Sequence, residues 1–175
     1  EKRRIARQEH RNKKWIGKNQ AERYKHSATA EKPTNKIKIG KEFYIATLNI
    51  QGVNQLGMRE SVEKYMINKN IKILALQETR IKTNQKEARK QFTWFFSGET
   101  QHTETDSNYT SGVGFVISND FVKYIEDIIP HSERIIQLTL KGSIPINIIS
   151  VYMAQAKRPE EEKERIYKAL NEITN

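Results

Sequence analysis

The sequence of 175 residues contains no cysteine, which excludes a disulfide framework and any thiolate-bound zinc. A metal ion in this protein would therefore be held by oxygen or histidine ligands. The sequence also has no apolar run close to the roughly 18 to 20 residues that span a membrane. Its first residues are charged, unlike a signal peptide. We therefore expect an intracellular protein with no membrane partner.

Charge is distributed very unevenly along the chain. Residues 1–41 contain 14 Lys and Arg against 4 Glu, whereas residues 42–175 contain 17 basic and 17 acidic residues, so the whole net charge of +10 lies in the first segment. That segment has few apolar residues and a turn-rich stretch around Pro33, which predicts a basic arm and linker over 1–41 and one folded domain over 42–175.

The basic arm has two interpretations. It is suited to binding nucleic-acid phosphates, and it is equally consistent with a solvated tail or a nuclear-targeting stretch. The arm residues expected to contact phosphates are Arg3, Arg4, Arg7, Arg11, Lys13 and Lys14.

Residues 42–175 alternate short apolar runs with helical patterns, which predicts an α/β or α+β domain. A strand over 43–48, a helix over 58–70 and a strand over 71–76 form a crossover, so the two strands should be parallel and end at the same edge of the sheet. Further strands are predicted at 92–96, 113–118, 121–129, 135–140 and 144–152, followed by a helix that Pro159 begins.

Two polar residues stand at the ends of the first two predicted strands. Asn49 ends the first, and Glu78 follows the second. Mg²⁺ prefers oxygen ligands and often uses only one or two carboxylates, so the pair could form part of a magnesium site. Taken alone, Glu78 is better explained as the first polar residue of a loop.

Five segments, in order, extend this interpretation: TLNIQG (47–52), LALQETR (74–80), YTSGVGFVIS (109–118), ERIIQLTL (133–140) and NIISVYMAQA (147–156). Together they resemble the endonuclease/exonuclease/phosphatase superfamily, which includes abasic-site endonucleases, pancreatic deoxyribonuclease and the endonuclease domains of non-LTR retrotransposons. The resemblance covers about residues 42–173 and is nearest in general texture to the retrotransposon branch.

The resemblance implies a four-layer β-sandwich flanked by helices and a Mg²⁺- or Mn²⁺-dependent phosphodiesterase, acting most naturally on DNA. By the same resemblance Glu78 binds the metal, Asn49 is its polar neighbour, Tyr152 lies near the scissile phosphate and Arg134 lies on the phosphate side. A reverse-transcriptase region in a longer product would be a natural partner. Gly112 and Gly114 are interpreted as architecture, because two glycines are too few for a phosphate-binding loop.

The sequence also departs from the family pattern. The Gly-Asp-Phe-Asn-like motif and the Asp-His pair expected later in the domain do not occur, which indicates a C-terminally truncated domain. The four histidines (His10, His26, His102 and His131) lie in the arm or in predicted polar loops and are expected to be surface residues.

Three hypotheses therefore remain open. The first is a fragment of a retroelement endonuclease that nicks nucleic acid only when completed. The second is a catalytically inactive nucleic-acid-binding or assembly protein built on the truncated fold. The third is a phosphatase acting on inositol lipids or another small phosphoester, which the basic arm disfavours.

Overall fold

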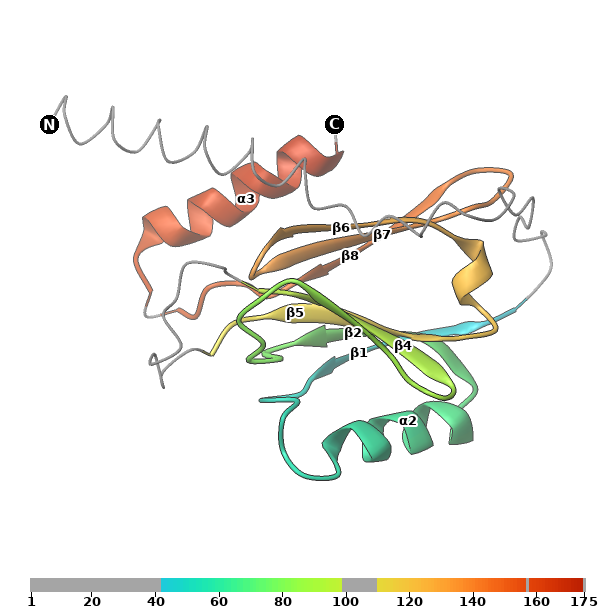
Figure 1. Cartoon of the computed structure of the whole chain (residues 1–175). Coiled ribbons are helices and arrows are strands. Elements are labelled where there is room, and N and C mark those ends of the chain that lie inside the picture. The colour runs from blue at the N-terminus through green and yellow to red at the C-terminus, as the bar shows by residue number, and fades with distance from the viewer. Residues whose placement is uncertain (1–41, 99–109, 157, 175) are drawn as a thin grey trace, which may run out of the picture.

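The computed structural model describes residues 42–98, 110–156 and 158–174 (Figure 1). The basic arm and the contacts predicted for it lie outside these residues. Eleven elements follow in chain order: β1 (Tyr44–Asn49), α2 (Met58–Asn68), β2 (Ile71–Gln77), β3 (Gln85–Ala88), β4 (Phe92–Ser97), β5 (Val113–Ser118), the 3₁₀ turn η1 (Val122–Tyr124), β6 (Ile125–Ser132), β7 (Ile135–Leu140), β8 (Ile146–Val151) and α3 (Glu160–Thr174).

The strands form two sheets. A five-stranded sheet has the order β1-β2-β5-β4-β3, and a three-stranded sheet has the order β6-β7-β8. β1 and β2 are parallel, which confirms the predicted crossover, whereas all other pairs are antiparallel. Because β1 and β8 each end the order of a sheet, each leaves one backbone edge without a strand partner among the described residues.

β4 shows how the sequence fills the space on both faces of the larger sheet. All six of its residues are buried. Trp94 and Phe96 join the apolar cluster that contains Met66 of α2, whereas Phe95 joins the cluster that contains Leu138 of the smaller sheet. Alternating side chains of one strand thus contact a helix on one side and a second sheet on the other.

The second helix covers the outer face of the smaller sheet. Ile166 and Ala169 of α3 are buried together with Ile135 of β7. Figure 1 accordingly shows α2, the five-stranded sheet, the three-stranded sheet and α3 one after another. The structure is a mixed α/β fold with two sheets and two α-helices in its described part, as the sequence predicts at this coarse level.

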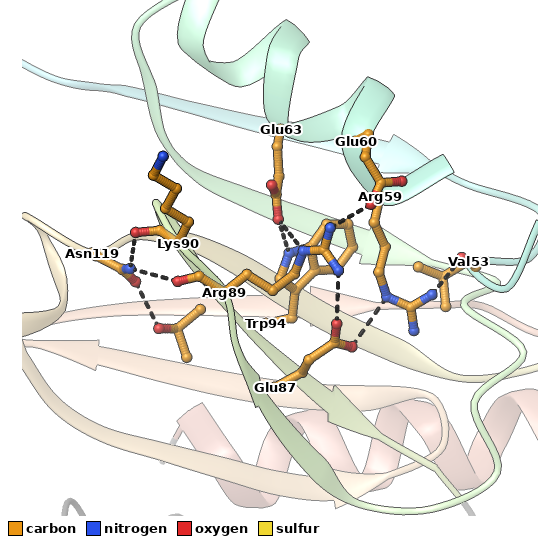
Figure 2. Close-up of polar contacts among 10 residues, drawn as sticks. Val53, Arg59, Glu60, Glu63, Glu87, Arg89, Lys90, Trp94 and Asn119 are labelled. Carbon is orange, nitrogen blue, oxygen red and sulfur yellow. Dashed lines mark hydrogen bonds and ion pairs between the residues drawn. The ribbon is translucent and has the colours of Figure 1, made fainter. Parts of the chain in front are cut away.

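An arginine joins α2 to the hairpin of β3 and β4 (Figure 2). The Arg89 guanidinium forms ion pairs with Glu63 at 2.7 Å and Glu60 at 2.5 Å, both on α2, and with Glu87 of β3 at 3.2 Å. Trp94 of β4 donates its indole N–H to the same Glu63 carboxylate at 2.9 Å. This cluster, the Arg89 clamp, fixes the helix that precedes β2.

Some element boundaries differ from the prediction. Sequence analysis misses β3 because its residues are mostly hydrophilic; the strand forms as a sheet edge by pairing with the buried β4. The single strand predicted over 121–129 divides into η1 and β6, because Phe121 O accepts the Tyr124 N–H in a tight turn. β8 is shorter than the predicted 144–152.

Candidate active site at the sheet edge

The parallel pairing of β1 and β2 brings Asn49 and Glu78 together. Asn49 pairs in register with Gln77, and Ile50 N–H donates to Gln77 O at 3.0 Å, so both strands end at one level. The Asn49 amide Nδ2 donates to Glu78 Oε1 at 2.8 Å. The juxtaposition predicted from the crossover is therefore present in the structure.

The loops that follow these strands are held in unusual backbone conformations. Gln51, Glu78 and Arg80 are non-glycine residues with φ of 52°, 53° and 58°. The left-handed region costs such residues about 1 to 2 kcal/mol, and strain of this kind is common at functional sites. Two backbone hydrogen bonds join these loops. Gly52 N–H donates to Glu78 O at 2.8 Å, and Val53 N–H donates to Thr79 O at 3.0 Å.

Tyr152 enters the site from the smaller sheet, just after β8. Its hydroxyl donates to Glu78 Oε1 at 2.9 Å, the same oxygen that accepts from Asn49. Partial burial, reinforced by the Glu78 carboxylate, raises the pKa of Tyr152 above its ordinary value. The phenol therefore stays protonated and acts as a hydrogen-bond donor at neutral pH.

A polar bridge beneath the site fixes the two sheets relative to each other. Gln77 of β2 donates from Nε2 to Ser150 Oγ of β8 at 3.0 Å and accepts from Thr47 Oγ1 of β1 at 3.1 Å. Ser150 in turn donates to Leu76 O at 3.2 Å. This bridge sets the position of Tyr152, two residues after Ser150. Sequence analysis misses it, although a polar Gln77 at the end of an otherwise buried strand was a usable signal.

Arg134, predicted on the phosphate side, is buried between β7 and α3, with 8% of its surface exposed. Its guanidinium pairs with Glu162 of α3 at 2.7 Å and lies 5.1 Å from the centre of the Tyr152 ring. It also donates to Tyr152 O at 3.4 Å, while Tyr152 N–H donates to Arg134 O at 2.9 Å. In this geometry Arg134 supports Tyr152 and anchors α3.

A cleft of about 590 Å³ opens beside the site, between the two edge strands β1 and β8. Polar groups of Thr47, Gln77 and Ser150 line it together with apolar side chains such as Ile45 and Ile148. The site is thus accessible along the side where neither sheet has a further strand partner in the described chain.

The site residues fit a partly hydrated Mg²⁺. Glu78 Oε1 holds two protein donors, and no donor among the described residues reaches Oε2. Asn49 Oδ1 is a second oxygen at the site, where it accepts only the Gln51 N–H at 3.3 Å. No group of three or more His, Asp and Glu in the described chain is arranged so that it could hold a metal ion. A metal here would take one carboxylate and one amide oxygen from the protein and complete its shell with water and substrate.

The histidine expectation is wrong for His131. It lies on β6 instead of in a polar loop, is partly buried, and its Nε2 is 3.0 Å from Gln137 Oε1. Burial lowers the pKa of His131, and the bond with Gln137 opposes that change in part. It forms no contact with Glu78. The other three histidines lie outside the described residues.

Comparison with known proteins adds no relative: no protein-family model matches the chain, and no curated protein matches it significantly. No helix in the described ranges is long and apolar enough to cross a membrane.

Proposed function

We propose that residues 42–175 form the metal-binding part of a nucleic-acid phosphodiesterase of the endonuclease/exonuclease/phosphatase type, with Glu78, Asn49 and Tyr152 at its centre. We propose further that the order of helices and sheets corresponds to the four-layer sandwich of that superfamily. Mg²⁺ or Mn²⁺ is the proposed cofactor and DNA the proposed substrate. The basic residues of 1–41 would supply most of the electrostatic attraction to its phosphates.

One observation carries the proposal. Residues from both sheets meet at a single carboxylate oxygen, Glu78 Oε1, while Oε2 has no protein donor in the described chain. Asn49 and Tyr152 each donate a hydrogen bond to that oxygen. The free oxygen is then available to a hard cation, and the left-handed backbone at Glu78 is consistent with a site held in place against local strain.

The geometry accounts for several requirements of phosphodiester hydrolysis. The reaction forms a bond from a water oxygen to phosphorus, breaks a P–O bond and transfers a proton to the leaving oxygen. A bound divalent metal would neutralise charge on the phosphoryl oxygens. Tyr152 retains its proton and donates a hydrogen bond to Glu78 Oε1 at 2.9 Å, so the phenol and the Asn49 amide together hold the carboxylate in place.

The residue that activates the water is absent from this edge in the described chain. His131 is the one histidine in the described ranges, and it is bonded to Gln137 on β6. General base catalysis contributes about 10²- to 10⁴-fold, so we expect slow hydrolysis by this chain.

The test is a plasmid-nicking assay with Mg²⁺ that compares the full chain with Glu78→Gln. The matched control is Glu126→Gln, which neutralises an exposed glutamate on β6. We expect slow, metal-dependent nicking that falls about 10²- to 10³-fold in Glu78→Gln and stays unchanged in the control. Added imidazole should accelerate the wild type by replacing the base. Nicking that is absent, or that persists in Glu78→Gln, would exclude this active site.

The second candidate is a catalytically inactive nucleic-acid-binding or assembly protein. It is favoured by the absence of a base from the described edge and by the concentration of net charge in residues 1–41. Steeply salt-dependent DNA binding without any metal-dependent nicking would support it over the first.

A further inference from the structure

Arg80 projects from the same loop as Glu78, two residues later in the chain. Its neighbours Thr79 and Ile81 are 0% and 6% exposed, so the backbone on both sides is fixed in the core. Its own N–H donates to Ser111 O at 2.9 Å, while its side chain is exposed. The loop therefore fixes the backbone of Arg80 at the surface, and this backbone sets the position from which the exposed side chain extends.

The side chain of Arg80 lies across Gly52, in the loop that follows Asn49. A Cβ atom placed on Gly52 would be 3.3 Å from Arg80 Cδ and 3.7 Å from Nε. The glycine, which has φ of 108°, thus leaves room for the arginine stem beside the candidate active site. This contact places the guanidinium group at the rim shared by the β1 and β2 loops.

Arg80 also differs from the arginines that stabilise the fold. Arg59, Arg89 and Arg134 each form an ion pair with a glutamate, whereas Arg80 forms none with the described residues. Its φ of 58° is a conformation that glycine would adopt with less strain. Arg80 is therefore a cation without an ion-pair partner among the described residues, and it occupies a left-handed backbone position two residues from Glu78.

We infer that Arg80 is a substrate-binding residue whose guanidinium contacts a phosphate of the nucleic-acid backbone next to the phosphodiester at Glu78. This inference rests on the proposed function, because it takes the Glu78 edge as the place where the nucleic acid lies. A planar guanidinium can donate two parallel hydrogen bonds to a phosphate, which positions the strand as well as attracting it.

The experiment measures binding of a short labelled DNA duplex by fluorescence anisotropy at a series of salt concentrations. All proteins are full chains in the Glu78→Gln background, so that the DNA stays intact. The test variant is Arg80→Ala, and Arg80→Lys retains the charge. The matched control is Arg165→Ala on α3, because Arg165 is also exposed and its side chain donates to a backbone carbonyl, Glu161 O, at 3.2 Å.

Arg80→Ala should weaken binding several-fold and lower the slope of log K against log salt by about 0.9, the value for one lost phosphate contact. Arg80→Lys should keep that slope, and Arg165→Ala should behave as the parent. A slope and affinity in Arg80→Ala equal to those of Arg165→Ala would overturn the inference, as would failure of the parent to bind DNA.

Arg80→Gly separates binding from folding. Relief of the left-handed strain should leave its urea midpoint equal to or above that of the parent, while its DNA affinity falls as in Arg80→Ala. A lower midpoint would mean that Arg80 serves the fold. Failure of plasmid nicking with a normal Arg80 effect would reject only the hydrolytic proposal, whereas Glu78-dependent nicking without an Arg80 effect would reject only this inference.

Discussion

Replacing Arg89 with methionine tests whether the Arg89 clamp holds α2 against the β3–β4 hairpin. The substitution keeps much of the aliphatic stem and removes the guanidinium. Glu63 then loses its ion pair at 2.7 Å and keeps the indole N–H of Trp94 at 2.9 Å. The stability change therefore reports on the charge pair and its burial more than on lost packing.

The expected magnitude follows from the exposure of the two partners. The Arg89 and Glu63 side chains are 27% and 16% exposed, so the pair is intermediate between a solvent-exposed ion pair and a buried one. Exposed pairs contribute about 0 to 1 kcal/mol, whereas removal of one partner of a buried pair costs about 3 to 5 kcal/mol. We expect Arg89→Met to lower the free energy of unfolding by about 2 kcal/mol.

Lys72 provides the matched control. It pairs with Asp120 at 3.0 Å, and the Asp120 side chain is 63% exposed, so Lys72→Met should cost less than about 1 kcal/mol. With an m-value of about 2 kcal/mol per molar urea for a domain of this size, the midpoint should fall by about 1 M for Arg89→Met and by less than about 0.5 M for Lys72→Met.

A double-mutant cycle with Glu63→Gln completes the assay and should give a coupling energy of about 1 kcal/mol between positions 63 and 89. Equal midpoints for Arg89→Met and Lys72→Met, or a coupling energy of zero, would show that the clamp does not contribute as its geometry indicates.

Two further predictions concern the stability of the fold, one at Gly112 and one at His131. In Gly112→Ala the new Cβ would lie 2.4 Å from Thr79 Oγ1 at φ of +99°, so we expect a loss of about 2 kcal/mol or more by urea denaturation. Gly57→Ala has open space at φ of +75° and should cost only about 1 kcal/mol; equal losses would contradict the close contact. Because burial lowers the pKa of His131, its contribution to stability is present above the pKa of the unfolded state and is lost as pH falls through the folded value. The free energy of unfolding should therefore fall as pH decreases below the ordinary histidine pKa of about 6.5, and His131→Gln should flatten this dependence; an unchanged profile would assign it to other groups.

The parts of the site that sequence analysis predicts are those governed by local rules. Apolar runs on both sides of a helical pattern indicated the β1-α2-β2 crossover, and a crossover between neighbouring strands makes them parallel, so that both end at one edge. Asn49 and Glu78 could therefore be placed together before any coordinates, and they are 2.8 Å apart at Nδ2 and Oε1.

The remaining contacts depend on how the two sheets lie against each other, which no local pattern encodes. Gln77 meets Ser150, 73 residues away, and Arg134 meets Glu162 on a different element. A resemblance could suggest a phosphate-side role for Arg134, but it could not show that a glutamate of α3 already compensates this charge. Likewise, a loop assignment for His131 missed that β6 extends through Ser132.

The ion pair between Arg134 and Glu162 bears on which basic residues could contact a phosphate. Residues 42–175 carry equal numbers of basic and acidic side chains, and the buried guanidinium of Arg134 is compensated by Glu162. In the proposed function, attraction over long distances would then come mainly from the basic residues of 1–41, which carry the whole net charge. The position of the substrate would instead depend on a few groups at the sheet edge, among them Arg80, which has no ion-pair partner in the described part of the chain. Affinity and positioning should therefore respond to different substitutions: loss of arm charge should weaken binding to any polyanion, whereas loss of Arg80 should alter how one phosphate is placed beside Glu78.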